Sequence, residues 1–219
     1  MKISIIIPAF NEEKYIGNCL KSLVNQTKKP DEIIIVDNNC TDKTIDIVKK
    51  YKEKLSIKII NEKKQGIVFA RNKGFNKANG NILVRCDADS ILSPNWVKRI
   101  RENFSKTKID GLTGPVIFYD FFIKTSVLSK IYLLLLKILQ NGETLIGPNM
   151  AITKNIWKKV KNEICFEEKN IHEDIDLSLH ILKKKGENSL RLEAYCLCVS
   201  KKNHQNSFYF FYQLSLASN

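Results

Sequence analysis

This chain of 219 residues lacks the features of several protein classes. Its longest apolar stretch, residues 127–139, is interrupted by Lys130 and Lys137, so no run approaches the roughly 20 apolar residues of a membrane-spanning helix. No secretory signal is visible, because the apolar stretch Ile3–Ile7 is short and stops at Pro8. The six cysteines contain no C-x-x-C pair. Their spacing indicates neither a zinc site nor a dense disulfide framework, and it favours a reducing, cytoplasmic compartment.

Acidic residues are the scarcer charge. The 36 Lys and Arg residues outnumber the 23 Asp and Glu residues, which gives a formal net charge of +13. This excess favours contact with anions such as nucleotides, nucleic acid or an acidic membrane surface, and it equally fits a solvated, lysine-rich surface. A nucleic-acid binder would need basic clusters interleaved with aromatic residues, whereas these lysines are dispersed. We therefore expect no nucleic-acid partner.

The apolar stretch at residues 127–139 has two interpretations. Lys130 and Lys137 are seven positions apart, so they share one face of a helix. The stretch is either a core helix whose lysines extend to solvent or a helix lying in the plane of a membrane surface. The second interpretation predicts peripheral contact with the cytoplasmic face of a membrane.

Strands and helices alternate in the first half of the chain. Four apolar runs predict strands, at residues 2–7, 32–36, 55–60 and 82–84. Pro8 is expected to end the first strand, Asn11 to cap the first helix, and Thr41 or Asp42 to cap the second. Continuous apolar strands separated by helices predict an α/β fold with a mainly parallel, twisted sheet covered by helices on both faces.

The second half of the chain is more mixed. Helices are predicted at residues 94–104 and 171–185, and strands within residues 111–118, 147–152 and 189–200. In the later helix an apolar stripe is expected to face the core, formed by Ile171, Ile175, Leu179 and Leu182. No repeat or low-complexity linker divides the chain, so residues 1–219 are expected to form one domain.

Three polar loops follow predicted strands, at residues 8–12, 37–42 and 87–89. In a parallel sheet these loops converge beyond the carboxyl ends of the strands, where ligands bind. Asp87 and Asp89 come directly after a buried strand, and carboxylates placed there predict a site for Mg²⁺ or Mn²⁺ that bridges to phosphate. Asp37 is a candidate partner for a base or a ribose; its alternative role is to cap a turn.

Neither common phosphate-binding glycine motif is present, G-x-x-x-x-G-K-[ST] or G-x-G-x-x-G. The charge of a bound diphosphate would therefore be neutralised by metal, with help from Arg71 or a nearby lysine. The alternative role of Arg71 is that of a solvated helix residue.

A second acidic cluster lies within residues 171–180. A zinc-protease H-E-x-x-H is excluded, because position 176 is Asp. On a helix, Glu173, Asp174 and Asp176 fall in the first turns, where carboxylates are favoured. They either cap the helix and form a solvated acidic face, or include a general base that faces the cleft.

Six short blocks occur in an order that resembles the family 2 glycosyltransferases of the GT-A fold: residues 5–13, 35–42, 66–74, 86–89, 147–151 and 173–177. The resemblance runs from Ile3 to about Leu182. It implies a nucleotide-diphospho-sugar donor, a divalent metal, and transfer with inversion to an acceptor hydroxyl on a lipid-linked or cell-surface glycan. Residues 1–105 would then bind the nucleotide sugar, residues 106–200 the acceptor, and residues 201–219 would form a tail.

The resemblance also implies roles for individual residues around the donor. The nucleotide pocket would be lined by Pro8, Ala9, Asn11 and Glu12. Asp37 would meet the base. The ribose and diphosphate would lie beside Gln65, Gly66 and Arg71.

For the metal and acceptor, the resemblance implies further roles. Asp89 would coordinate the metal directly, Asp87 would contact the ribose or metal-bound water, and His204 is a weaker match to a late metal-binding histidine. Gly147 and Asn149 would border the sugar and acceptor. Asp174 would be the catalytic base, with Glu173 beside it.

Two other functions stay open. A nucleotidyltransferase would usually carry a glycine-rich, basic loop after the first strand, but residues 8–12 are acidic and contain no glycine. An inactive relative that binds a nucleotide is disfavoured by the presence of Asp89 and Asp174.

Overall fold

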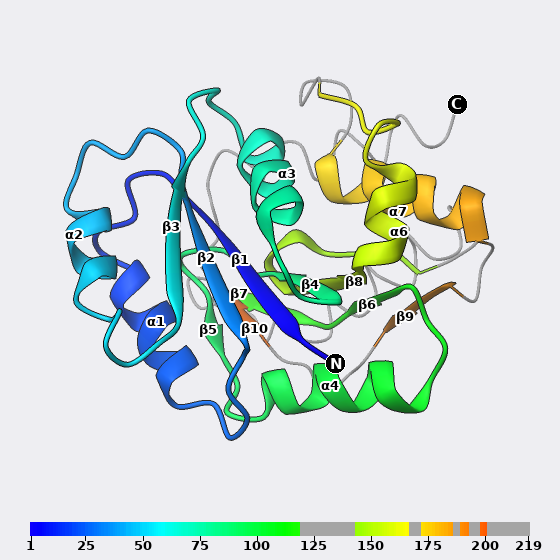
Figure 1. Cartoon of the computed structure of the whole chain (residues 1–219), viewed down its shortest axis with the longest axis horizontal. Coiled ribbons are helices and arrows are strands. Elements are labelled where there is room, and N and C mark those ends of the chain that lie inside the picture. Colours follow the sequence, from blue (N-terminus) through cyan, green and yellow to red (C-terminus); the bar gives the residue numbers. More distant parts are fainter. Residues whose placement is uncertain (119–142, 167–171, 186–188, 193–197, 201–219) are drawn as a thin grey trace.

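The computed structural model describes residues 1–118, 143–166, 172–185, 189–192 and 198–200. Its centre is a seven-stranded sheet with the order β3-β2-β1-β4-β8-β6-β9 (Figure 1). The bounds of these strands are β1 Ile3–Ala9, β2 Glu32–Asp37, β3 Ile57–Asn61, β4 Ile82–Arg85, β6 Gly111–Thr113, β8 Met150–Thr153 and β9 Leu190–Leu192. A smaller sheet has the order β5-β10-β7 and contains β5 Ile91–Leu92, β7 Val116–Phe118 and β10 Cys198–Ser200.

The large sheet is mainly parallel. β1 pairs in parallel with β2 and β4, β2 pairs in parallel with β3, and β6 pairs in parallel with β9. The exception is β8, which lies antiparallel between β4 and β6. The carboxyl ends of β1, β2, β3 and β4 therefore share one edge with the amino end of β8. We call this the ligand edge.

Helices cover both faces of the sheet, as predicted. One face packs against α1 (Ile16–Val24), α2 (Thr44–Lys49) and α4 (Trp96–Lys106). The other packs against α3 (Ile67–Lys77), α6 (Lys154–Val160) and α7 (Glu173–Lys185) (Figure 1). Successive residues of β1 divide between the two cores, with Ile5 and Ile7 in the first and Ile6 in the second, because side chains of a strand alternate between its faces. A continuous apolar run is what such a strand requires.

Gly74 sets how closely α3 approaches the sheet. A Cβ atom at Gly74 would lie 2.4 Å from Cγ2 of Ile6 and 3.1 Å from Cγ2 of Val36. Both neighbours are fully buried. The absence of a side chain at this position lets the helix backbone rest directly on β1 and β2.

Pro8 does not end the first strand, so that prediction is wrong. β1 continues to Ala9, and Pro8 pairs with Val36 of β2. Backbone groups of residues two apart in a strand point to the same side. The carbonyl of Ile6 accepts the N–H of Cys86, after β4, so an N–H at position 8 would also point toward β4. The register between β1 and β4 ends at Ile6 and Arg85, so the missing donor interrupts no ladder hydrogen bond.

The predicted helix caps differ in detail. Asn11 does not cap α1, which begins at Ile16; its Oδ1 instead accepts hydrogen bonds from the backbone N–H (2.8 Å) and hydroxyl (3.3 Å) of Thr41. Asp42 accepts the N–H of Thr44, the first residue of α2, at 2.9 Å. Asp42 therefore satisfies a donor at the start of α2 from two positions away.

The apolar stripe predicted for the last helix is wrong at Leu179, whereas Leu182 packs against the core and Ile171 lies outside the described residues. Leu179 is 39% exposed, whereas the buried side chains of α7 are Glu173, Asp176, Leu177, Ser178 and Ile181. The polar members can be buried because they are hydrogen-bonded inside the protein, so the acidic cluster is not a solvated face. Helix α6 was not anticipated; Oγ1 of Thr153 accepts the N–H of Ile156 at its start.

No helix in the described part of the chain is long and apolar enough to cross a membrane. The stretch at residues 127–139, His204 and the expected tail at residues 201–219 lie outside the described residues.

Candidate active site

The loops after β1, β2 and β3 meet at the ligand edge, and Asn38 joins them; the loop after β3 was not among the three that the sequence predicted to converge. Its N–H donates to the carbonyl of Ala9 (2.9 Å), and its side-chain amide donates to the carbonyls of Glu62 (2.9 Å) and Lys64 (2.8 Å). Its Oδ1 accepts the N–H of Gly66 at 2.9 Å. Asn38 is 3% exposed, so it is a structural organiser of this edge. The sequence offered one sign of it, an amide directly after Asp37.

Asp37 and Gln65 lie on the rim of this joined region. Oδ1 of Asp37 accepts the N–H of Cys40 at 2.9 Å, so the carboxylate caps the turn, while the side chain stays half-buried at the end of β2. Oε1 of Gln65 accepts the side-chain amide of Asn39 at 3.0 Å. Burial raises the pKa of the Cys40 thiol from 9.0 to about 11, and the neighbouring Asp37 carboxylate acts in the same direction.

The first loop is fixed by its backbone. Pro8 and Ala9 are buried at the end of β1, and the N–H of Glu12 donates to Oγ1 of Thr44 at 2.7 Å. Asn11 has a positive φ of 54°, which aims its side chain at the loop after β2. These residues lie at the ligand edge, beside the loop after β2.

The loop that carries Asp87 and Asp89 follows β4. The N–H of Ser90 closes a turn on the carbonyl of Asp87 at 3.1 Å, and both carboxylates are half-buried. Arg85, the last residue of β4, donates to Oδ1 of Asp87 from Nε (3.1 Å) and from Nη2 (2.8 Å). Arg85 therefore fixes the first acid of the pair.

The start of α7 reaches the same edge. The N–H of Gly147 donates to Oδ2 of Asp174 at 3.0 Å, and Oδ1 of Asp174 accepts the N–H of Ile175 at 2.8 Å. Gly147 opens the short helix η1 (Gly147–Asn149), which leads into β8. The antiparallel direction of β8 thus places Gly147 at the ligand edge, against the acidic end of α7.

Glu173 lies between two arginines. One carboxylate oxygen is ion-paired with Nη1 of Arg71 and the other with Nη1 of Arg85. Arg71 also donates to the carbonyl of Glu173 at 2.8 Å. Arg71 is fully buried, so the solvated alternative for this residue is wrong. Neither arginine–glutamate pair was anticipated, because Glu173 lies about a hundred residues after α3 and strand β4 in sequence.

Asn149 is turned into the protein. It is 2% exposed; its Oδ1 accepts from Nε1 of Trp96 (2.8 Å), and its amide donates to the carbonyl of Pro115 (3.1 Å). The predicted contact of its side chain with sugar or acceptor therefore has no support from these bonds.

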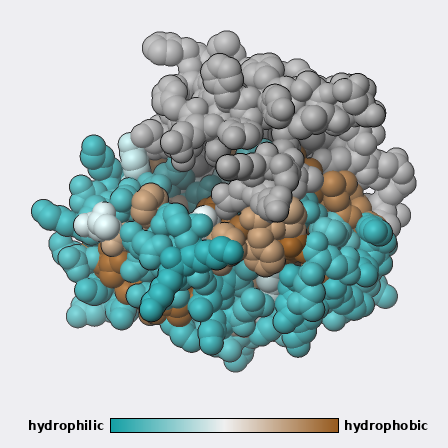
Figure 2. Space-filling view, turned by 90° about the horizontal axis from the view of Figure 1, so that it is seen from above, coloured by the Kyte–Doolittle hydropathy of each residue, from teal (hydrophilic) through white to brown (hydrophobic). Residues whose placement is uncertain are grey.

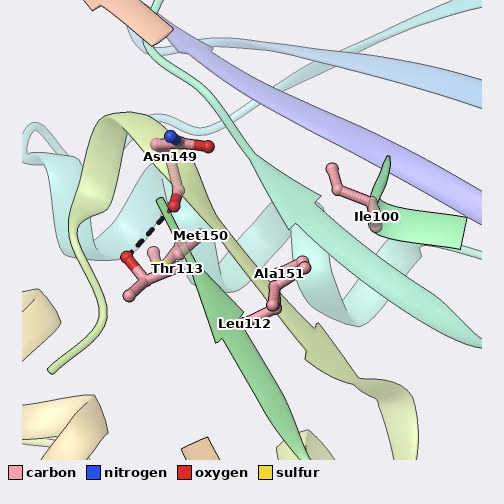
Figure 3. Close-up of a pocket in the computed structure, with 6 residues that line it drawn as sticks. All are labelled: Ile100, Leu112, Thr113, Asn149, Met150 and Ala151. Atoms are coloured by element: carbon pink, nitrogen blue, oxygen red, sulfur yellow. Dashed lines mark hydrogen bonds between the residues drawn. The ribbon is translucent and has the colours of Figure 1, made fainter. Parts of the chain in front are cut away.

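A small cavity lies between α4, β6 and β8. Figure 3 shows its lining, in which Oγ1 of Thr113 donates to the carbonyl of Asn149 at 3.2 Å. The six residues that line it are Ile100, Leu112, Thr113, Asn149, Met150 and Ala151. The space is too small for a water molecule, so it is part of the core packing.

The donor set at the ligand edge suits a hard divalent cation. Asp87 and Asp89 offer carboxylate oxygens, and within the described ranges no group of three or more His, Cys, Asp and Glu side chains surrounds a metal position. Two carboxylates fit a cation that takes its remaining ligands from phosphate oxygens and water, as Mg²⁺ and Mn²⁺ do.

Figure 2 views the molecule from the side on which β1 ends. The described surface there is largely hydrophilic, with hydrophobic residues at several places among the hydrophilic ones. Two exposed aromatic side chains belong to this part of the molecule: Phe10, directly after β1, is 49% exposed, and Phe166 is 50% exposed and stacks on Phe69 of α3 with ring centroids 5.4 Å apart.

The sequence matches the model of one protein family, Glycosyl transferase family 2, over residues 4–167. The chain belongs to this family. A curated relative from Methanococcus voltae is 40% identical over 111 residues, covering 48% of this chain and 35% of the relative. Its name is dolichyl N-acetyl-alpha-D-glucosaminyl phosphate 3-beta-D-2,3-diacetamido-2,3-dideoxy-beta-D-glucuronosyltransferase.

Solved structures show the same fold. S. aureus TarS in complex with UDP-GlcNAc has a TM-score of 0.74 at 23% identity, over 99% of this chain and 65% of that one. The mannosyltransferase PcManGT from Pyrobaculum calidifontis, in complex with GDP-Man and Mn²⁺, has a TM-score of 0.72 at 17% identity, over 95% of this chain and 59% of that one. The predicted GT-A fold is confirmed.

The chain spans only part of the length of its relatives. The matched region covers 20% of one curated relative, from Streptococcus pneumoniae, and 40% of another, from Haloferax volcanii. The residues 4–167 that match the family model include β1 from Ser4 onward, the strands β2 to β4, and the loop with Asp87 and Asp89.

Proposed function

We propose that this chain transfers a sugar, with inversion, from a nucleotide-diphospho-sugar to an acceptor hydroxyl. One observation carries the proposal: the N–H of Gly147 holds Asp174 at the edge where the loop of Asp87 also lies. A fixed carboxylate next to a candidate metal and phosphate site supplies the two groups that the reaction needs, a base and a means to stabilise the leaving group.

In the proposed reaction Asp174 takes the proton of the acceptor hydroxyl as its oxygen attacks the anomeric carbon. The bond from that carbon to the diphosphate oxygen breaks on the opposite side, which inverts the configuration. A divalent cation held by Asp87 and Asp89 would stabilise the charge on the departing diphosphate. The amide of Gly147 keeps the base oriented, since it holds one carboxylate oxygen and leaves lone pairs for the substrate proton.

We assign the nucleotide to the joined loops after β1, β2 and β3. Asp37 would meet the base, and Pro8, Ala9, Asn11, Glu12, Gln65 and Gly66 would form the pocket wall. The hydrogen bonds of Asn38 support this assignment, because they hold these loops in one arrangement before any donor arrives. Arg71 faces Glu173, so we assign it an indirect role.

The relatives support the substrate classes. TarS was solved with UDP-GlcNAc and PcManGT with GDP-Man and Mn²⁺, and the Methanococcus voltae relative is named for a dolichyl-linked acceptor. We propose a UDP- or GDP-sugar donor, Mn²⁺ or Mg²⁺, and a glycan or lipid-linked acceptor. We also propose that the chain acts in the cytoplasm as a peripheral protein at the membrane face. Sedimentation with anionic liposomes tests that location. Protein that stays in the supernatant in the presence of the liposomes would contradict it.

A donor screen tests the reaction. Calorimetry with UDP-, GDP- and dTDP-sugars, with and without Mn²⁺, is expected to find one donor that binds in the presence of metal. Asp174→Asn is expected to lower the rate of transfer about 10²–10⁴-fold while donor affinity is kept, because only the base is removed. Asp176→Asn is the matched control, since Asp176 lies on the same helix but accepts from Cys165 N–H at 3.0 Å, away from Gly147. Lack of binding by every donor would refute the proposal, and loss of donor binding in Asp174→Asn would remove Asp174 from the role of base.

A further inference from the structure

Two charged groups that the proposed reaction does not use connect the metal loop to the base helix. Arg85 is 4% exposed and Glu173 is 8% exposed. Buried charges are rarely kept without a partner, and each of these has more than one. Their contacts run from Arg71 through Glu173 and Arg85 to Asp87, across α3, α7, β4 and the loop after β4.

The guanidinium of Arg85 has both of its edges occupied. Nε and Nη2 hold Oδ1 of Asp87 at 3.1 and 2.8 Å, and Nη1 is ion-paired with Glu173. The planar group therefore acts as a rigid link between two carboxylates. A displacement of Glu173 would reach Asp87 through this plane.

Gly147 packs directly on the same guanidinium. A Cβ atom at Gly147 would lie 2.9 Å from Nη1 and from Nη2 of Arg85. The N–H of the same glycine holds Asp174 at 3.0 Å. The guanidinium of Arg85, which positions Asp87, thus also contacts the backbone of Gly147, which positions Asp174.

We propose that Glu173 is a positioning residue which, through Arg85, fixes Asp87 and so sets the geometry of the metal loop relative to Asp174. This inference rests on the proposed function. Glu173 binds no metal and takes no proton in it. Both of its oxygens are occupied by arginines, which is the reason it differs in role from its neighbour Asp174.

The test measures Mn²⁺ binding directly. Electron paramagnetic resonance of free Mn²⁺, titrated with the full chain in the presence of UDP, gives an affinity without any turnover. Glu173→Gln is expected to weaken Mn²⁺ binding about 10-fold, the low end of the effect of residues that orient metal ligands. Arg85→Lys is expected to weaken Mn²⁺ binding similarly, because one ammonium group cannot hold the carboxylates of Asp87 and Glu173 in the geometry of the planar guanidinium. The double variant is expected to be no weaker than either single variant, since both changes break the same link.

Two further variants keep the test decisive. Glu173→Asp retains the buried negative charge but is one methylene shorter, so it carries the test if Glu173→Gln fails to fold. Asp176→Asn is the matched control: it removes a buried carboxylate of α7 that pairs with His180 at 3.3 Å and makes no contact with Arg71 or Arg85 among the described interactions. It is expected to leave Mn²⁺ affinity unchanged.

The outcomes separate this inference from the proposed function. Three results would overturn the positioning role while the wild type still binds its donor. They are an unchanged Mn²⁺ affinity in folded Glu173 variants, additive losses of Mn²⁺ affinity in the double variant, and an equal loss of Mn²⁺ affinity in Asp176→Asn. Failure of the wild type to bind any donor with Mn²⁺ would overturn the proposed function, and this inference with it.

Discussion

Two glycines in helices of this protein are expected to respond in opposite directions to the same substitution. In Gly74→Ala, the new Cβ lies 2.4 Å from Cγ2 of Ile6, about 1 Å closer than the 3.4 Å at which ordinary contacts begin. Ile6 is fully buried within the sheet and has no free space to enter. In Gly17→Ala, the nearest atom is Cγ2 of Ile47 at 3.7 Å, an ordinary contact.

The magnitudes follow from two opposing effects. Alanine is favoured over glycine inside a helix by about 1 kcal/mol, which benefits both variants. Overpacking a filled core costs about 1–3 kcal/mol, and a contact as short as that of Gly74 belongs at the upper end. We therefore expect Gly74→Ala to lose about 2 kcal/mol of unfolding free energy and Gly17→Ala to gain up to about 1 kcal/mol.

Urea unfolding followed by far-UV circular dichroism measures both variants. The midpoint of Gly74→Ala is expected to fall with an unchanged slope, and its Tm to drop by about 4–8 °C. The packing of α3 on the sheet would be refuted if the two variants shifted in the same direction, or if Gly74→Ala matched the wild type.

Three further predictions concern single side chains. Because burial raises the pKa of Cys40 to about 11, its alkylation by iodoacetamide, followed by mass spectrometry, is expected to stay slow at pH 8 and to reach half its maximal rate near pH 11; half-maximal rate near pH 9 would contradict this. Burial alone would raise the pKa of Asp31, but hydrogen bonds from the N–H of Ile3 and from Arg101 outweigh it, and the pKa lies below 3.8. The ionised carboxylate therefore stabilises the folded state above pH 3.8, and this contribution is lost as the pH falls below that value. Asp31→Asn is therefore expected to be less stable than the wild type in urea at pH 7, and the gap to narrow below pH 3.8; a gap independent of pH would contradict this. Trp96→Phe removes the indole donor of the buried Asn149 and is expected to cost about 1–3 kcal/mol in the same assay, whereas an unchanged midpoint would show that this bond is dispensable.

Much of the fold was predictable because its signals are local. The runs at β1, β2 and β4 are mostly apolar, as expected of strands covered on both faces. Pro8 was misjudged for a reason outside its own segment: whether its missing N–H matters depends on where β4 leaves β1. The face of α7 was misjudged for a similar reason, because Ser178 and Glu173 are buried only through partners on distant elements.

The candidate site divides in the same way. Asp87, Asp89 and Asp174 lie in short motifs with a recognisable spacing, and the structure places all three at the ligand edge. Arg85 has no such spacing, and the only sign of Asn38 is its place directly after Asp37. Arg85 pairs with Glu173 across a separation of 88 residues, and Asn38 binds backbone carbonyl groups, whose positions the side-chain types do not reveal. Residues that act through the backbone or through distant ion pairs require the three-dimensional structure.

The antiparallel strand β8 also determines how this protein can be handled as a reagent. Since β8 begins at the ligand edge, it ends at the opposite edge, where Thr153 and Lys154 donate backbone hydrogen bonds to Asp110 and Asn81. Lys108 lies exposed beside that edge, in the loop before β6. A fluorophore or a surface linker attached there would face away from the ligand edge, which makes the opposite edge suitable for immobilised binding assays.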